Sequence, residues 1–318
     1  MSDLYMTTHH PIKNVQLLHN PNAGDKNHNK ETLMQHIEDK GFRCSYSSIK
    51  EEGWEHVSDD IDMLAVASGD GAIRKVVRML LNRAVKDKAF PIGIIPMGTA
   101  NNIAKSLGAP IDMEQAIEVW TKGIIQKHDI GILTNVPEEE FFMEGVGYGI
   151  FPELMKQMKK RGKEKIEEPE EKLKATLKLL HELILNYEAV PCHIEVDGRQ
   201  FAGKYILVEV MNTKAIGPNL ALSDKAVPDD SVFEVVMVSD EQRQQLADYV
   251  LGKMNGNEEP PTLQMAQGAH IQIDWHGREM HVDDRFIEVK KSTVIGIELR
   301  EKLISFILPE RPTPGLSM

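Results

Sequence analysis

The sequence predicts an N-terminal α/β domain with a parallel sheet, followed by a β-rich, sandwich-like second domain. Residues 63–67 form a short unbroken apolar run, which indicates a strand covered on both faces. Apolar residues then recur at offsets of three and four, which is typical of one face of a helix. After about residue 122 the alternation of strand and helix gives way to strands joined by short turns.

The first domain is expected to alternate strand and helix after a loose tail at 1–11. Gly41 ends the first helix, and Gly108 with Pro110 ends the third. The predicted strands are 15–19, 42–49, 63–67 and 90–95, and the predicted helices are 29–40, 73–81, 103–107 and 112–122. This alternation predicts a parallel sheet that binds its ligands at the carboxyl ends of the strands.

The second domain is expected to contain mostly strands with turns such as Asp197-Gly198 between them. We place the two domains at 1–128 and 129–318, with a charged helical insertion at about 153–188. The predicted strands are 124–133, 140–146, 193–196, 205–211 and 232–238.

The insertion at 153–188 carries a basic run between Lys156 and Lys165, followed by acidic residues from Glu167 to Glu171. A solvated helical hairpin explains this pattern. A basic edge that steers anionic headgroups is the alternative. Its apolar residues fit either core packing or an apolar lip, and they are Met155, Met158, Leu173, Leu177, Leu180 and Ile184.

Composition excludes several classes of protein. The chain has 318 residues and a net charge of −12, which argues against nucleic-acid binding because phosphate neutralisation needs a basic face. The two cysteines, Cys44 and Cys192, favour a reducing compartment. The polar N-terminus and the lack of an apolar run of about 20 residues predict a cytoplasmic protein without a transmembrane segment.

Two strand-to-helix turns carry the chemistry of the first domain. Ser68-Gly69-Asp70-Gly71 follows one strand, and Gly98-Thr99-Ala100-Asn101-Asn102 follows the next. Glycine permits a sharp turn and leaves the main chain bare, so the N–H groups at a helix start can face an anion. An acid among such amides, here Asp70, is explained by a cation that accompanies phosphate or by a ligand hydroxyl. Either turn alone is also compatible with an ordinary connection between a strand and a helix in an α/β domain.

Together with Asn20-Pro21-Asn22-Ala23-Gly24, these turns resemble the three nucleotide-site motifs of the diacylglycerol kinase catalytic family, which includes sphingosine kinases and is distantly related to NAD kinases. The resemblance implies two domains with the nucleotide cleft between them, and a hydroxyl near Ser48 or Ser47 that reaches the nucleotide. The implied ATP-binding residues are Asn20, Pro21, Asn22, Ala23, Gly24, Ser48, Ser68, Gly69, Asp70, Gly71, Ala72, Thr99 and Asn101.

The motifs also depart from the family pattern. Ala23 and Ala72 replace hydroxyl residues, Ser68 replaces Gly, and Lys75 replaces the usual Glu. Each lost neutral hydrogen bond weakens binding by only about 1 kcal/mol. The basic residues Arg74, Lys75 and Arg78 either compensate this loss near the phosphates or form the solvent face of their helix.

Residues 227–232 resemble the family's Asp-Asp-Gly-Leu stretch, which holds a structural Mg²⁺. Position by position, the resemblance implies a metal site made by Asp230 with the carbonyls of Val227 and Val232. Oxygen ligands of this kind suit Mg²⁺. Because Ser231 replaces the expected Gly, an ordinary acidic turn is the alternative.

The segment 280–285 aligns with the family's D-G-E loop, whose acidic residues act as the base for the acceptor hydroxyl. Asp283 is kept, Asp284 stands for Gly, and Arg285 stands for Glu. Arg cannot accept a proton, so the resemblance leaves Asp283 or Asp284 as the catalytic base. Without catalysis, Arg285 would instead bind a phosphate or a lipid headgroup.

The predicted function is an ATP- and Mg²⁺-dependent kinase that phosphorylates a diacylglycerol-like lipid at a membrane surface. The alternatives are a catalytically impaired relative that binds nucleotide or lipid, and a kinase for a small soluble alcohol or dinucleotide. Strand edges in the second domain offer a route to a homodimer. The histidines near the acidic C-terminal segment, His270, His276 and His281, are expected at the surface of strands rather than around a metal.

Overall fold

A computed structural model of the chain describes residues 12–24, 29–83, 88–98, 101–161, 169–223, 225–257 and 259–310. These residues form two compact units. Unit 1 holds the described residues up to Lys127 and those from Ile304 onward, and unit 2 is His128–Leu303. The sequence assigned all of 129–318 to the second domain, whereas the last strand returns its carboxyl end to unit 1.

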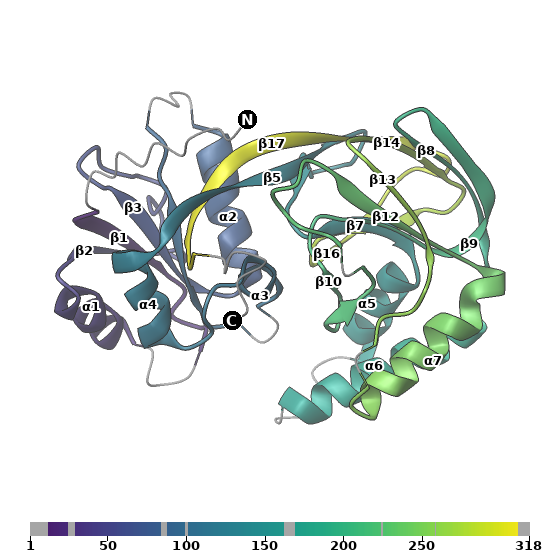
Figure 1. Cartoon of the computed structure of the whole chain (residues 1–318), viewed down its shortest axis with the longest axis horizontal. Coiled ribbons are helices and arrows are strands. Elements are labelled where there is room, and N and C mark those ends of the chain that lie inside the picture. The colour runs from purple at the N-terminus through teal and green to yellow at the C-terminus, as the bar shows by residue number, and fades with distance from the viewer. Residues whose placement is uncertain are drawn as a thin grey trace, which may run out of the picture. The chain divides into compact units, whose positions relative to one another are not determined.

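Unit 1 is an α/β domain with parallel strands, as predicted (Figure 1). The sheet order is β17-β4-β3-β1-β2, and neighbouring strands pair in parallel, from His19 beside Ser48 to Phe306 beside Ile92. Its elements are β1 (Asn14–His19), α1 (Lys30–Asp39), β2 (Arg43–Ser48), β3 (Met63–Ser68), α2 (Asp70–Leu81), β4 (Ile92–Pro96), α3 (Asn102–Leu107) and α4 (Met113–Lys122).

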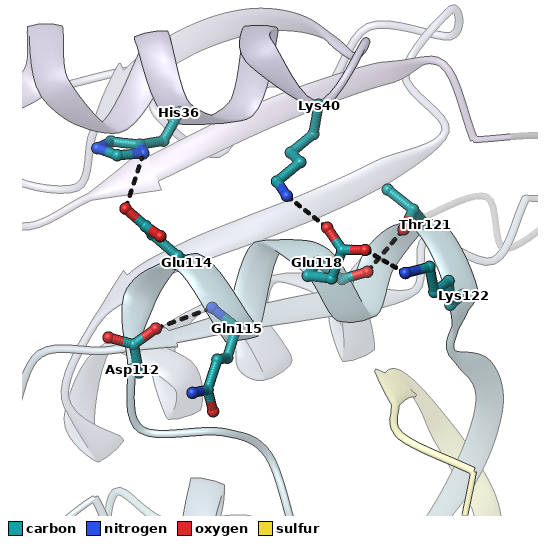
Figure 2. Close-up of polar contacts among 8 residues, drawn as sticks. All are labelled: His36, Lys40, Asp112, Glu114, Gln115, Glu118, Thr121 and Lys122. Atoms are coloured by element: carbon teal, nitrogen blue, oxygen red, sulfur yellow. Dashed lines mark hydrogen bonds and ion pairs between the residues drawn. The ribbon is translucent and has the colours of Figure 1, made fainter.

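Every residue of β3 is buried, because α1 and α4 pack on one side of the sheet while α2 contacts the strand as well. Alternate residues of β3, namely Met63, Ala65 and Ala67, pack with Trp120 of α4. Figure 2 shows the polar rim of the α1–α4 contact, where Glu118 lies between Lys40 and Lys122. This double salt bridge sits outside the apolar core, so the core and not the ion pairs holds the helices on the sheet.

Unit 2 is rich in antiparallel strands. The chain enters it along β5 and leaves it along β17. Its elements are β5 (Ile124–Thr134), β6 (Phe141–Phe142), β7 (Gly145–Gly149), α5 (Ile150–Arg161), α6 (Pro169–Asn186), β8 (Val190–Val196), β9 (Arg199–Met211), β10 (Ala215–Ile216), β11 (Leu220–Ala221), β12 (Phe233–Ser239), η1 (Asp240–Gln242), α7 (Arg243–Met254), β13 (Gln264–Gly268), β14 (His270–Trp275), β15 (Glu279–Val282), β16 (Arg285–Glu288) and β17 (Val294–Leu308).

The long strand β9 organises unit 2. Its first half pairs with β8, and its second half pairs with β7 on one edge and β12 on the other. One buried core lies among the strands, around Phe142, Tyr148 and Phe233. A second core lies between strands and the helices α5, α6 and α7. The β-rich, sandwich-like prediction is therefore confirmed.

The charged insertion contains two helices in contact, α5 and α6, as predicted, but their apolar face is buried rather than solvated. Leu177, Leu180 and Ile184 are buried in the second core, and Met158 and Leu173 pack against it. The interpretation as core packing holds for these residues, because α6 packs along α7. The residues between Arg161 and Pro169, including much of the basic-to-acidic transition, lie outside the described part of the chain. Among the helices that are described, none has the length and apolar character needed to cross a membrane.

Candidate functional site

In unit 1, the loops that follow β1, β3 and β4 are tied together by main-chain hydrogen bonds. Asn20 N donates to Ala67 O at 3.2 Å, and Gly24 N donates to Met97 O at 3.1 Å. Met97 N in turn donates to Ser68 O at 2.9 Å. The three segments that resemble nucleotide motifs therefore lie at one carboxyl edge of the parallel sheet, as the sequence predicts.

Gly69 and Gly98 lie back to back in two of these loops. A Cβ atom on Gly98 would be 2.7 Å from Gly69 Cα, and a Cβ on Gly69 would be 3.0 Å from Gly98 Cα. Real Cβ atoms essentially never show the first distance, and the second is tighter than most Cβ contacts. The approach of the loops therefore requires glycine at Gly98 and favours it at Gly69.

Asn101 closes the loop after β4. It adopts a left-handed conformation with φ 50°, which Asn tolerates better than most residues. Its Oδ1 accepts from Gly98 N at 2.8 Å, and its Nδ2 donates to Gly98 O at 2.8 Å. Thr99, a predicted phosphate ligand, and Ala100 lie outside the described residues. For Asn101 the structure thus shows a loop-forming role.

Asp70 joins the two strand–helix turns. Its Oδ2 accepts from Asn102 N at 2.9 Å and its Oδ1 from Ile103 N at 3.1 Å. These are free amides at the start of α3, which has no cap from its own N-cap residue. The carboxylate therefore caps a neighbouring helix. The sequence interpretation of Asp70, as a partner for a cation or ligand hydroxyl, stays a prediction.

The predicted hydroxyl near the nucleotide is buried at the end of β2. Ser48 Oγ accepts from Lys50 N at 3.3 Å, and Ser48 is only 3% exposed. Ser47 Oγ accepts from Gln16 Nε2 at 3.0 Å instead. The choice between the two serines for the nucleotide stays a prediction.

The remaining predicted nucleotide residues divide by exposure. Pro21, Asn22, Gly24 and Gly71 are exposed, while Ala23 is partly buried. Ala72 is buried on the inner face of α2. Of the basic residues on α2, Lys75 faces solvent, but Arg74 is buried, so the solvent-face interpretation fails for Arg74.

The first acidic turn of unit 2 follows β11 and precedes β12. Ser231 has φ 65°, a left-handed conformation that suits the Gly expected at this place from the resemblance. Ser231 N donates to Asp129 Oδ2 at 2.9 Å, and Val232 N donates to Asp230 Oδ1 at 3.2 Å. Asp129, which the sequence did not single out, thus anchors the turn.

The predicted cation ligands of this turn are a carboxylate and two main-chain carbonyls, of which the Val227 carbonyl accepts from Asp229 N at 2.9 Å and from Asp230 N at 3.4 Å. Burial raises the pKa of Asp230, the Val232 N–H opposes this, and the negative charge of Asp129 raises it further. Asp230 is exposed, and Val227 is partly so. No group of three or more His, Cys, Asp or Glu side chains in the described parts of the chain could hold a metal ion. A cation here would therefore need main-chain carbonyls such as those of Val227 and Val232.

The second acidic turn is Asp283-Asp284, which joins β15 to β16. Asp283 has φ 51° and is 7% exposed. Its Oδ1 accepts from Glu144 N at 2.8 Å, from Gly145 N at 3.0 Å and from Met143 N at 3.2 Å. These amides are unavailable for strand pairing, which explains why the predicted strand 140–146 splits into β6 and β7. Asp284, by contrast, is exposed.

His281 is buried, which corrects the expectation of a surface histidine; His270 is exposed as expected. His281 Nε2 lies 2.8 Å from Glu209 Oε2, and its Nδ1 lies 3.0 Å from Asp283 O. Burial lowers the pKa of His281, but the charge and hydrogen bond of Glu209 outweigh it and leave the pKa raised. Burial raises the pKa of Glu209 despite the opposing charge of His281.

Arg285, which stands where the resemblance leads us to expect Glu, pairs with acids. Its guanidinium donates to Glu139, whose side chain is fully buried, and lies 3.8 Å from Glu138. These carboxylates already engage the guanidinium. The interpretation of Arg285 as a ligand for phosphate or a headgroup stays a prediction.

Asn212 connects the two acidic turns. Its Nδ2 donates to Asp129 O at 3.0 Å and to Met143 O at 2.9 Å. Asp129 anchors the 227–232 turn, and the Met143 amide is bound by Asp283. Sequence reasoning missed Asn212, Asp129 and Glu209, because only the pairing of distant strands brings them together. The signal available for Glu209 was a lone acid in a strand of otherwise apolar residues, Ile206–Met211.

Comparison with known proteins gives two family matches. Residues 14–133 match the model of the diacylglycerol kinase catalytic domain. Residues 157–289 match the model of the YegS C-terminal NAD kinase beta sandwich-like domain. The first match runs past the predicted junction at 128/129 to residue 133, and the second lies wholly within the predicted second domain.

Curated relatives and solved structures agree with these matches. A diacylglycerol kinase of Bacillus subtilis (strain 168) is 25% identical over 248 residues, covering 75% of this chain and 77% of its own. One from Staphylococcus carnosus (strain TM300) is 27% identical over 241 residues, covering 71% and 72%. A crystal structure of a diacylglycerol kinase from Bacillus anthracis str. Sterne has a TM-score of 0.69 at 18% identity, covering 93% of this chain and 97% of its own.

Proposed function

Since the chain belongs to the diacylglycerol kinase family, we propose that it transfers the γ-phosphoryl group of ATP to the hydroxyl of a diacylglycerol-like lipid. The observation that carries this proposal is the convergence of three loops at one carboxyl edge of the parallel sheet, tied through Gly24, Ser68 and Met97. That edge is where open α/β sheets bind ligands.

On the nucleotide side, bare main chain supports the proposal. Gly69 and Gly98 carry no side chain of their own, and their close contact leaves no room for a Cβ on Gly98. Amides at the start of α2, which has no side-chain cap, suit phosphate oxygens. We assign the binding of the phosphates to Asn20, the Gly69–Gly71 turn and Thr99. Asp70 would hold the two turns together and also contact the nucleotide.

On the acceptor side, we assign the base to Asp284. The carboxylate of Asp283 is occupied by three main-chain amides, whereas Asp284 is exposed in the same turn. Asp230 with the carbonyls of Val227 and Val232 would hold Mg²⁺, which supplies charge neutralisation in phosphoryl transfer. Positioning and charge stabilisation then provide most of the rate, and proton removal by Asp284 adds to it.

One observation favours a second candidate, a nucleotide- or lipid-binding module without catalysis. The acid of the related sequences is replaced by Arg285, whose guanidinium is bound to Glu139. The catalytic base would then have to come from the Asp283-Asp284 turn. The two candidates differ in whether any acceptor is phosphorylated.

The test is transfer of radiolabel from γ-labelled ATP with Mg²⁺ to diacylglycerol, a sphingoid base or glycerol, each offered separately with detergent. We expect labelled diacylglycerol, and for Asp284→Asn a fall in kcat of about 100-fold or more with ATP binding unchanged. Asp248→Asn, an exposed acid on α7, is the matched control and should keep full activity. ATP binding without any labelled acceptor would favour the second candidate, a binding module without catalysis. Label in glycerol alone would exclude a lipid substrate.

A further inference from the structure

Glu209 and His281 face each other across an intervening strand. In the register of the sheet, Glu209 of β9 is opposite Gly147 of β7, and Gly147 is opposite His281 of β15. Because the middle residue has no side chain, the carboxyl group can pass over it. Its Oε2 then lies 2.8 Å from His281 Nε2.

Two glycines make the space for this carboxyl group. A Cβ on Gly147 would be 2.0 Å from Glu209 Oε2, and a Cβ on Gly145 would be 2.8 Å from Glu209 Oε1. Both side chains of the pair are almost completely inaccessible, at 0% for Glu209 and 2% for His281. Glu209 Oε1 has no hydrogen-bond partner among the described residues.

Such a pair is a poor source of stability. Removing two polar groups from water costs more than their attraction returns unless every hydrogen bond is made, and apolar residues of similar size often do as well or better. Glu209 leaves one oxygen unsatisfied. The pair must therefore be explained by what it holds in place.

What it holds is the Asp283-Asp284 turn. A carbonyl oxygen only accepts, so His281 Nδ1 carries the proton in its 3.0 Å contact with Asp283 O. Glu209 at Nε2 holds the ring in that orientation, and Phe151 of α5 packs edge-on at 5.9 Å between ring centroids. Asp283 is in the left-handed region, so its main chain needs such support.

We propose that Glu209 and His281 are positioning residues that set the conformation of the Asp283-Asp284 turn and, through it, the place of the Asp284 carboxylate. The proposal rests on the proposed function for its catalytic consequence. Its structural consequence does not depend on the proposed function. Asp283 binds the amides of residues 143–145, so the protection of these amides from hydrogen exchange should depend on the Glu209–His281 pair.

The first readout is hydrogen exchange of the peptide that contains residues 143–145 in the full-length protein. We expect Glu209→Ala and His281→Ala to speed exchange there by about tenfold or more, through local opening. Met280→Ala is the matched control. It removes a fully buried neighbour on the same strand that belongs to the core among the strands, so it tests loss of packing without loss of the contact to Asp283. Equal exchange in the two alanine variants and wild type would overturn the proposal.

The second readout separates hydrogen bonding from charge. Glu209→Gln keeps a side chain that can form a hydrogen bond with His281 Nε2, so it should retain wild-type exchange and most of kcat. His281→Ala should lower kcat far more than it raises KM for the lipid. Loss in Glu209→Gln as large as in Glu209→Ala would overturn positioning by the hydrogen bond. If wild type phosphorylates no acceptor, the proposed function fails, and the exchange data alone decide the positioning role.

Discussion

The loops of unit 1 and the acidic turns of unit 2 are built in different ways. At the carboxyl edge of the parallel sheet, main-chain hydrogen bonds and two touching glycines shape the loops after β1, β3 and β4. In unit 2, buried side chains such as Asp129, Asn212 and Asp283 bind main-chain groups more than 60 residues away. The comparison teaches that phosphate-type loops can be predicted from local sequence, whereas the acidic turns depend on long-range pairing.

The largest expected effect comes from Asp70, whose side chain joins the turns after β3 and β4. Asp70→Ala leaves the amides of Asn102 and Ile103 without acceptors. With about 1.5–3 kcal/mol for each hydrogen bond to a charged group, we expect a loss of about 3–5 kcal/mol in the free energy of unfolding, measured in urea. Asp112→Ala, which removes the exposed cap of Gln115 N on α4, should cost about 1 kcal/mol. Equal losses would mean that Asp70 is an ordinary cap.

Gly98→Ala tests the contact between the loops. The new Cβ would meet Gly69 Cα at 2.7 Å, so the two turns must separate. We expect a cost of about 1–3 kcal/mol and weaker ATP binding by calorimetry. Gly252→Ala on α7 is the control, since its nearest neighbour would be at 3.6 Å, and should raise stability by about 0.5–1 kcal/mol. Unchanged ATP affinity in Gly98→Ala would separate the loop contact from the nucleotide.

His281 gives unit 2 a pH-dependent stability. Because its folded pKa is raised, its stabilisation is complete below the ordinary His pKa of about 6.5 and is lost as pH rises through the folded value. The pKa of Glu209 is also raised, so its contribution to stability likewise falls as pH rises. We expect stability to fall above pH 6.5 with a slope of at most about 1.4 kcal/mol per pH unit for one proton. His281→Gln should flatten this part of the curve, and His270→Gln, at an exposed position, should not.

Ser231→Gly should give the smallest change, in the direction of greater stability. A left-handed residue other than Gly costs about 1–2 kcal/mol, and part of that gain is offset by the greater chain entropy of Gly. We expect a net gain of about 0.5–1 kcal/mol in urea unfolding. A loss would mean that the Ser231 side chain contributes to the turn beyond its main-chain bond to Asp129.

The sequence by itself determined the α/β unit, the β-rich unit and the motif loops. The apolar run before Ser68 and the glycines after it predict a buried strand and a bare turn, because these signals lie within a few residues of one another. The same local signals placed the helices of unit 1 within three residues of their bounds, the largest difference being at the start of α2. They also predicted strands at 205–211 and 232–238, although β9 begins earlier, at Arg199.

Only the tertiary structure decided what the acids do. Asp70 caps a helix 32 residues away, Asp283 binds amides 138 to 140 residues away, and Glu209 reaches His281 over a glycine of a third strand. The side-chain types at these positions fit a ligand, a metal or a surface equally well. Strand register and burial select among them, because a carboxylate removed from water must find donors, and those donors come from whichever segments the sheet brings beside it.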